Sequence, residues 1–351
     1  MESAVNLKIV EVVKETEDAI SIHFKQPFLK KIKYVPGQFL TLLTEIEGRI
    51  ERRCYSINTA PKVDSTISVT VKRIKDGKVS NHLYNTVKKG DSMKVLKPMG
   101  GFTLEPNPKL SRDIVLFGAG SGITPLMSMA KSTLYNEKKS RVSLFYGNRD
   151  VESVIFNEQL SALKTEFNGR LNLVHILENP GDFEGCYKGR VERSQVRNLL
   201  EQIPDLKKVD AEYFICGPSG MMKEAEEGLK SYGVSEEKIH IEKFTAPPPS
   251  AGETKASGAM LETREVSITL KGKEHLVSVK PNKTILDAAL DNKVNIPYVC
   301  MDGICGSCKA KCTSGEIQMR SGSILSKKDE EAGYVLTCLS KPLTNNVKLE
   351  V

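Results

Sequence analysis

Four cysteines near the end of the sequence constrain the fold more than any other feature. They are spaced C-x4-C-x2-C, with a fourth cysteine after 29 intervening residues, at Cys300, Cys305, Cys308 and Cys338. This is the plant-type spacing of [2Fe–2S] sites, in which four thiolates supply the outer sulfur ligands of two irons. Gly303 and Gly306 suit a loop that wraps around a cluster, because glycine permits positive φ and close backbone approach. We therefore expect these cysteines to hold a [2Fe–2S] cluster.

A structural zinc site and a set of redox-inert buried cysteines are the alternatives. Zinc sites usually pair two C-x2–4-C knuckles, whereas here the fourth cysteine stands alone. Cys312 completes a local set with the first three cysteines. This set differs from the bacterial run C-x2-C-x2-C-x3-C-P in its first spacing and in the absence of the proline. Cys312 lies in Lys309–Ile317, which we predict to be an outgoing strand. We interpret Cys312 as a packed side chain.

The composition is that of a folded, globular chain. Apolar residues make up 39% and charged residues 27% of the 351 residues, which argues against global disorder and predicts about two or three domains. The net charge is +7 without a long Lys/Arg block, so we expect neither a nucleic-acid nor a membrane partner. The N-terminal pattern is not that of a signal peptide, and no apolar window has the length of a membrane span. We expect a cytoplasmic protein, in which clustered cysteines favour a metal site over disulfides.

The first 108 residues show the patterns of short strands. Over 67–71, apolar residues alternate with polar ones, a period of two that is typical of a half-buried strand. Turn signals recur at Asp76-Gly77, Lys89-Gly90-Asp91 and Gly100-Gly101. These patterns predict a small barrel or sandwich.

Residues 109–244 alternate strand and helix patterns. The strand patterns lie at Asp113–Phe117, Arg141–Tyr146, Leu171–Leu177 and Glu212–Cys216. The helical patterns lie at 125–135, Glu158–Phe167 and Arg193–Gln202. This alternation predicts a parallel sheet with helices on both faces.

A segment rich in Pro, Ala, Gly and Ser follows at 245–260 (TAPPPSAGETKASGAM). It has almost no large side chains with which to bury apolar surface, so we predict a linker. Residues 261–351 form a third module. Strand patterns at Glu265–Leu270 and His275–Val279 and a helical pattern at Thr284–Leu290 precede its cysteines.

Two motifs in the first module suit a flavin. Residues 53–56 read R-x-Y-S at the end of a strand, and GKVSN at 77–81 opens a helix. An arginine fork and a helix N-terminus are two ways to hold a pyrophosphate. The Tyr55 ring can lie on an isoalloxazine, whose N5 the Ser56 hydroxyl can hydrogen-bond. Taken alone, such residues are more often ordinary surface or core residues without a ligand. FMN is an alternative to FAD as the bound flavin. The predicted flavin-binding residues are Arg53, Tyr55, Ser56, Gly77, Val79, Ser80 and Asn81.

A glycine-rich turn, GAGSGITP at 118–125, follows the first strand of the second module and precedes a helix. Its third glycine comes one place too early for G-x-G-x-x-G. Glycines still let the backbone approach a pyrophosphate at a positive helix N-terminus. A tight turn that needs glycine for its own geometry is the alternative. The residues predicted to bind nucleotide here are Gly118, Gly120, Gly122 and Thr124.

The motifs occur in the order of a known superfamily. VPGQF at 35–39, RCYS at 53–56, GKVSN at 77–81, GAGSGITP at 118–125, YGNR at 146–149 and CGPSGMM at 216–222 resemble the ferredoxin–NADP reductase superfamily. With a C-terminal plant-type ferredoxin, the whole chain resembles the reductase components of multicomponent oxygenases, above all those of phenylacetyl-CoA epoxidases. The resemblance implies an antiparallel β-barrel FAD domain at 1–108 and an α/β parallel-sheet NAD(P)H domain at 109–244. After the linker at 245–260, it implies an α+β ferredoxin-like (β-grasp) domain at 261–351.

The resemblance also implies roles at two strand ends. In the family, the cysteine of the CGP motif lies beside the nicotinamide, which gives that position to Cys216, followed by Gly217 and Pro218. Otherwise Cys216 is simply a small buried residue. Asn148 and Arg149 follow a strand where the adenosine 2′ position would be read. An arginine there favours NADPH over NADH, although Asp150 is adjacent.

Together the modules predict an electron path. NAD(P)H would reduce the flavin near Ser56 and Cys216, and the [2Fe–2S] cluster would pass single electrons to an outside acceptor. The resemblance suggests an oxygenase partner, in particular a di-iron epoxidase acting on an acyl-CoA. A Rieske oxygenase or a hybrid-cluster protein is an alternative acceptor. A redox sensor that binds flavin and cluster without turnover is the alternative function.

Overall fold

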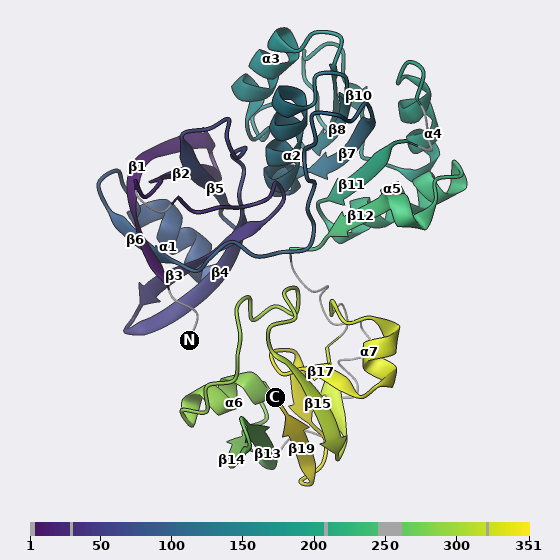
Figure 1. The fold of residues 1–351 in the computed structure, drawn as a ribbon. Helices are drawn as coiled ribbons and strands as arrows, with labels where there is room; N and C mark the ends of the chain where they lie inside the picture. Colours follow the sequence, from purple (N-terminus) through teal and green to yellow (C-terminus); the bar gives the residue numbers. More distant parts are fainter. Residues whose placement is uncertain (1–3, 29–30, 207–209, 245–261, 321–322) are drawn as a thin grey trace. The chain divides into compact units, whose positions relative to one another are not determined.

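The computed structural model describes residues 4–28, 31–206, 210–244, 262–320 and 323–351, so the predicted linker at 245–260 lies outside the described residues. The chain divides into two compact units, residues 2–243 and residues 244–351 (Figure 1). The first two predicted modules share the first unit, and the domain boundary between them at 108/109 stays a prediction. Among the described residues, no helix is long and apolar enough to cross a membrane.

Six antiparallel strands form the sheet of the N-terminal module, in the order β4-β3-β6-β1-β2-β5. They are β1 (Val5–Thr16), β2 (Ala19–Lys25), β3 (Phe39–Ile46), β4 (Arg49–Ser56), β5 (Thr66–Lys72) and β6 (Ser92–Val95). Ile57, directly after β4, bridges Val69 of β5, so the two edge strands meet and the sheet closes on itself. The apolar face of the predicted alternation is confirmed, since Ile67, Val69 and Val71 all belong to one core with α1 (Lys78–Thr86). The expectation of a half-buried strand is wrong, because Ser68 and Thr70 on the other face are buried as well. The expected antiparallel barrel is therefore confirmed.

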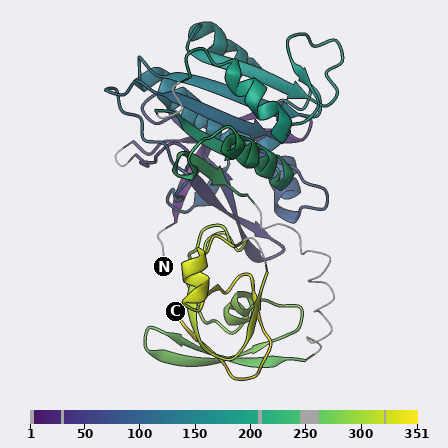
Figure 2. The same ribbon diagram turned by 90° about the vertical axis from the view of Figure 1, so that its right-hand side faces the viewer.

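The second module is a parallel sheet in the order β10-β9-β8-β7-β11-β12. Its strands are β7 (Asp113–Ala119), β8 (Arg141–Asn148), β9 (Leu171–Leu177), β10 (Tyr187–Lys188), β11 (Glu212–Cys216) and β12 (Ile239–Glu242). Its helices are α2 (Ile123–Asn136), α3 (Asn157–Glu166), α4 (Arg193–Glu201) and α5 (Ser219–Ser231). Right-handed crossovers put α2 and α3 on one face and α4 and α5 on the other, the side toward the viewer in Figure 2. The strand order reverses between β7 and β11, and ligands bind at the carboxyl ends of strands at such a point.

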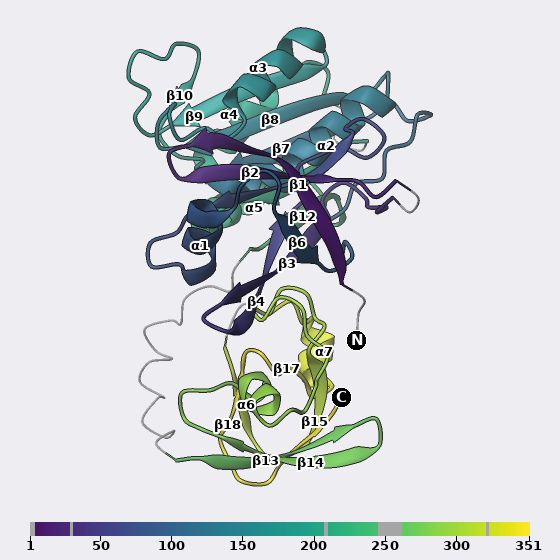
Figure 3. The same ribbon diagram turned by 90° about the vertical axis from the view of Figure 1, so that its left-hand side faces the viewer.

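The second unit contains a five-stranded mixed sheet in the order β14-β13-β19-β15-β17 and a small pair, β16-β18. The elements are β13 (Arg264–Leu270), β14 (Lys273–Val279), α6 (Ile285–Asp291), β15 (Lys309–Ser314), β16 (Ile317–Met319), α7 (Lys327–Glu331), β17 (Tyr334–Leu336), β18 (Ser340–Pro342) and β19 (Val347–Glu350). Helix α6 begins with a capping box between Thr284 and Asp287 and lies across the sheet (Figure 3). This mixed sheet crossed by a helix confirms the expected α+β fold.

Candidate functional site

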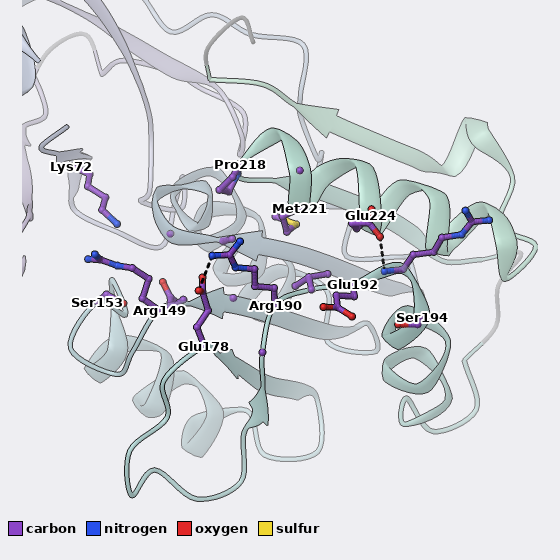
Figure 4. A pocket seen from close by; sticks show the side chains of 18 residues that line it. Lys72, Arg149, Ser153, Glu178, Arg190, Glu192, Ser194, Pro218, Met221 and Glu224 are labelled. Carbon is purple, nitrogen blue, oxygen red and sulfur yellow. Dashed lines mark hydrogen bonds and ion pairs between the residues drawn. The ribbon is translucent and has the colours of Figure 1, made fainter. Parts of the chain in front are cut away.

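A cavity of about 960 Å³ opens at the switch point of the parallel sheet (Figure 4). Four residues predicted from the sequence line it, namely Gly120, Asn148, Arg149 and Pro218. They come from the carboxyl ends of β7, β8 and β11, which meet at one edge of the sheet. Glycine-rich turns and helix N-termini at such an edge bind pyrophosphate groups. The cavity is therefore the candidate site for a dinucleotide.

A tight 3₁₀ turn, Gly120–Gly122, joins β7 to α2 at the cavity. Gly120 has a φ of +51°, and its carbonyl oxygen accepts a hydrogen bond from the Tyr146 hydroxyl at 3.0 Å. A Cβ on Gly120 would meet only the Lys72 Nζ, at 3.7 Å. The backbone of the turn is thus open on the cavity side, where a phosphate group can approach it.

Three other predicted glycines, Gly118, Gly122 and Gly217, do not line the cavity. They belong to its wall, which means that they lie behind the lining residues, where the surrounding elements pack together. A Cβ on Gly122 would lie 2.0 Å from the carbonyl oxygen of Cys216. One on Gly217 would lie 3.1 Å from the Ala119 nitrogen, and one on Gly118 would lie 3.0 Å from a side chain of α2. Glycine at these positions lets β7, α2 and β11 approach one another closely.

Cys216 and Thr124 are both buried and also belong to the wall. The Thr124 hydroxyl donates to the Ser121 carbonyl oxygen at 3.0 Å. Burial raises the pKa of the Cys216 thiol well above its usual value, and the neighbouring Glu242 carboxylate adds to the effect. Cys216 therefore stays a neutral thiol, which suits packing and not nucleophilic attack.

Two cations gather at one end of the cavity (Figure 4). Lys72 ends β5 of the barrel, and Arg149 follows β8. Burial, together with the charge of Arg149, lowers the pKa of Lys72. The Asp150 carboxylate accepts the Ser153 N–H at 2.9 Å, so it is engaged within its own turn while Arg149 lines the cavity. Sequence reasoning missed Lys72, whose one signal was its place at the end of a predicted strand.

Acidic residues and their basic partners line the rest of the cavity (Figure 4). Arg190 pairs with Glu178, at 2.9 Å between the guanidinium and the carboxylate. The Glu224 carboxylate accepts a hydrogen bond from the backbone N–H of Arg193, at the start of α4, at 3.0 Å. The sequence analysis missed all four, because they come from separate loops and helices that only the folded sheet brings together. Carboxylates in such a cavity can accept hydrogen bonds from ribose hydroxyls.

The predicted flavin residues lie on β4 and at the start of α1. Arg53 and Tyr55 are half-buried on β4, and Ser56 at its end is buried. Burial raises the pKa of Tyr55 to about 12, so its hydroxyl stays protonated. The Arg53 guanidinium lies 3.6 Å from the Glu51 carboxylate. This strand end offers an aromatic ring, a hydroxyl and a guanidinium in one short stretch, which fits a flavin.

The backbone N–H groups in the first turn of α1 are available to an anionic ligand, because no side chain caps the N-terminus of the helix. The Asn81 side chain instead donates to the carbonyl oxygens of Ile74 and Gly77, at 3.0 and 2.8 Å. Ser80 Oγ accepts the Ile74 N–H at 3.3 Å, and Val79 packs into the core. These residues shape the turn, so its backbone N–H groups are the part that suits a pyrophosphate.

The four predicted cluster cysteines form two hydrogen-bonded pairs, Cys300 with Cys305 and Cys338 with Cys308. Within each pair the shared hydrogen bond lowers the pKa of one thiol, Cys305 or Cys308, and raises that of its partner, Cys300 or Cys338. Across the described residues, no group of three or more His, Cys, Asp or Glu side chains is arranged around a single metal ion. Two neighbouring pairs of cysteines fit a cluster with two irons, each of which takes two protein sulfur ligands.

The backbone of the loop that carries the first three cysteines suits close wrapping around a cluster. The Asp302 N–H donates to Cys300 Sγ at 3.4 Å, the kind of contact that tunes a cluster. Gly303 and Gly306 have φ values of +76° and +71°, and a Cβ on Gly303 would lie 2.2 Å from a leucine side chain. Cys312 is on β15, where its thiol donates to backbone carbonyl oxygens.

Three domain families match successive parts of the chain. They are the oxidoreductase FAD-binding domain at 6–104, the oxidoreductase NAD-binding domain at 116–227 and the 2Fe-2S iron-sulfur cluster binding domain at 268–343. Their order and positions agree with the barrel, the cavity and the paired cysteines.

Two relatives match nearly the whole chain. One of the subunits of 1,2-phenylacetyl-CoA epoxidase from Escherichia coli (strain K12) is 33% identical, over 98% of this chain and 97% of its own. The ferredoxin reductase component of 3-ketosteroid-9-alpha-monooxygenase from Rhodococcus rhodochrous is 36% identical, over 99% and 97%. The chain belongs to the family of these FAD- and [2Fe–2S]-dependent reductases. The resemblance seen in the motifs is confirmed.

The fold of the reductase agrees with this family. The structure of phthalate dioxygenase reductase, a modular structure for electron transfer from pyridine nucleotides to [2Fe-2S], aligns with a TM-score of 0.71. It is 23% identical, and the alignment covers 99% of this chain and 98% of that one.

The reductase uses FAD, a [2Fe–2S] cluster and a nicotinamide nucleotide. When bound, FAD accepts a hydride from the nucleotide, and the cluster carries electrons singly. The chain itself supplies positioning. The Gly120 turn and the α1 N-terminus each expose backbone N–H groups, and Lys72 and Arg149 place positive charge at the cavity, which are features that suit phosphate groups.

The Glu242→Gln variant is expected to gain stability over wild type as the pH rises from 5 to 8. Burial raises the pKa of Glu242 to about 7, so the folded protein keeps a proton that the unfolded chain releases near the ordinary value of about 4.5. Folding of wild type therefore becomes less favourable between these two pKa values, by up to roughly 3 kcal/mol. Urea unfolding of the holo-reductase at several pH values measures the difference.

Glu237→Gln is the matched control, because Glu237 is an exposed carboxylate on the turn before β12. It should follow wild type at every pH. A constant difference between Glu242→Gln and wild type from pH 5 to 8 would contradict a raised pKa.

Proposed function

We propose that the reductase takes electrons from NADPH and delivers them one at a time, through FAD and the [2Fe–2S] cluster, to an oxygenase partner in the cytoplasm. The partner we infer is a di-iron enzyme of the phenylacetyl-CoA epoxidase type. The observation that carries this proposal is the end-to-end similarity to a component of such an epoxidase. It is supported by the flavin strand, the nucleotide cavity and the paired cysteines, which occur in the corresponding order along the chain.

In this proposal each module has one cofactor. Residues 1–108 hold FAD, residues 109–244 hold the nucleotide, and residues 261–351 hold the cluster on its four cysteines. Ser56, at the end of β4, contacts the flavin. Cys216 belongs to the wall behind the nicotinamide, where its buried, neutral thiol packs between neighbouring elements and does not act as a base.

The coenzyme in this proposal is NADPH, because Arg149 lines the cavity and the neighbouring Asp150 is engaged with Ser153. Arg149→Gln is expected to raise the KM for NADPH roughly 10-fold, the loss of a charge-assisted contact to a phosphate. The KM for NADH should change less than about twofold, because NADH lacks the 2′-phosphate. Steady-state reduction of ferricyanide with each coenzyme measures both values.

Arg197→Gln is the control for this prediction. Arg197 is an exposed arginine on α4 that pairs with Glu201, and its loss should leave both KM values as in wild type. An equal weakening of NADPH and NADH by Arg149→Gln would show that Arg149 does not read the 2′-phosphate.

An anaerobic titration of the holo-reductase, with NADPH and then separately with NADH, tests the electron path. Flavin and cluster absorbance should bleach together within seconds, and cytochrome c should then be reduced. If both cofactors are bound but neither nucleotide reduces them, a redox sensor is favoured.

The acceptor needs a separate test, because a relative of similar identity serves a 3-ketosteroid monooxygenase. When the reductase is mixed with the purified oxygenase part of a phenylacetyl-CoA epoxidase and with phenylacetyl-CoA, NADPH oxidation should be accompanied by a matching amount of epoxide product. Faster coupling to a Rieske oxygenase or to a hybrid-cluster protein would replace the proposed partner.

A further inference from the structure

Helix α2 is buried on two faces. Eleven of its fourteen residues are buried, whereas a helix at a protein surface buries a single stripe. One face packs on β7 and β8 of the parallel sheet. The other face contacts the barrel, and Figure 1 shows α2 between the two. The sequence patterns predicted this helix but not its second partner.

Two polar side chains of α2 bond directly to the barrel. The buried Ser128 hydroxyl donates to the Thr59 carbonyl oxygen at 2.6 Å. Lys131 Nζ contacts both carboxylate oxygens of Asp64, at 2.6 and 2.8 Å, and the exposed fractions of the two side chains are only 15% and 22%. An ion pair this well shielded from water holds its geometry far better than an exposed one.

The barrel segment that receives these bonds, residues 59–64, makes further hydrogen bonds within the barrel. Thr59 lies three residues after Ser56, and its hydroxyl accepts the Tyr34 O–H at 3.0 Å and the Ser68 N–H at 3.2 Å. The Asp64 carboxylate also accepts the N–H of Ala60 at 2.7 Å. The segment directly after β4, the strand that carries the predicted flavin residues, is therefore joined to α2 through short hydrogen bonds and one ion pair.

The N-terminus of α2 directly follows the nucleotide turn, Gly120–Gly122. We infer that Ser128 and Lys131 are positioning residues, which fix the nucleotide turn relative to the flavin strand through the rigid helix between them. This inference rests on hydride transfer from nucleotide to flavin. That step requires the reacting atoms to lie about 3–3.5 Å apart, and a misplacement of about 1 Å can cost roughly 100-fold in rate.

Anaerobic stopped-flow reduction of the holo-reductase by NADPH tests this inference with Lys131→Met and Asp64→Asn. The limiting rate constant of flavin reduction should fall roughly 10- to 100-fold in each. The Kd for NADPH should stay within about threefold and the FAD content should not change, because neither residue lines the cavity. The long-wavelength charge-transfer absorbance between nicotinamide and flavin should weaken in parallel.

Arg141→Met is the matched control. It removes a bidentate pair with Asp113, at 2.8 and 3.0 Å, that lies wholly within the nucleotide module. Its limiting rate should stay within about threefold of wild type. The double variant Lys131→Asp with Asp64→Lys restores an ion pair and should recover most of the rate, which a merely destabilising change would not do.

Three results would overturn the inference. They are an unchanged limiting rate in Lys131→Met, an equal slowing in Arg141→Met, and slowing that only follows a loss of FAD. A wild-type reductase that neither nucleotide reduces would instead remove the proposed function. The two failures are therefore distinguishable.

Discussion

The Cys338→Ala variant is expected to lose the [2Fe–2S] cluster while its flavin is still reduced by NADPH. Cys338 is paired with Cys308, so alanine removes one of the two thiolates that would hold one iron. At metal sites, loss of a residue that only hydrogen-bonds to a ligand already lowers metal affinity or activity roughly 10- to 100-fold. Loss of a ligand itself should have a larger effect, so we expect cytochrome c reduction to fall at least about 100-fold. Ferricyanide reduction should persist, because ferricyanide takes electrons directly from the flavin. Iron content, visible absorbance and the two acceptor assays provide the measurement.

Cys312→Ala tests the rival set of ligands on the same module. Cys312 hydrogen-bonds to backbone carbonyl oxygens of its own turn, so its replacement should leave iron content and both activities near wild type. If instead Cys312→Ala lost the cluster and Cys338→Ala retained it, the four local cysteines would be the ligands.

Gly122→Ala is expected to destabilise the first unit and to abolish reduction by NADPH. The added Cβ would lie 2.0 Å from the Cys216 carbonyl oxygen and 2.8 Å from the Gly217 nitrogen, and backbone atoms in two packed elements cannot move aside cheaply. Overpacking of this kind costs about 3 kcal/mol or more, so the melting temperature should fall by roughly 10 °C. Calorimetry and NADPH-dependent flavin bleaching test the two effects.

Gly101→Ala is the control, since a Cβ there meets no atom within 4 Å. It should melt and react as wild type does. A Gly122→Ala protein of normal stability that has lost only nucleotide affinity would show that Gly122 contacts the nucleotide, as the sequence suggested, and does not serve close packing.

Much of the fold could be predicted because local patterns were strong. The strands at Leu171–Leu177 and Glu212–Cys216 have the predicted bounds, since each is a short apolar run between turn signals. The strand order of the barrel could not be predicted. Ser92–Val95 lies between β1 and β3, and nothing local records which distant strands will pair.

The candidate site was predictable where the chain itself brings residues to a strand end, as at Asn148 and Arg149. Lys72 was missed because it reaches the cavity from the barrel, which lies far away in the sequence. Gly118 and Gly122 were predicted as ligand contacts but lie in the wall. A glycine that admits a phosphate and one that admits a neighbouring backbone look the same in sequence, and only the space around them separates the two roles.

The burial of α2 between the parallel sheet and the barrel limits where recombination can join segments of different reductase genes. A recombination event near residue 108 would join a foreign barrel to α2 and leave Ser128 and Lys131 without the carbonyl oxygen and carboxylate that they now contact. A break near residue 244 separates the two compact units and leaves those contacts intact. Gene fusion is therefore expected to move residues 2–243 as one block, with the iron–sulfur module gained or lost independently.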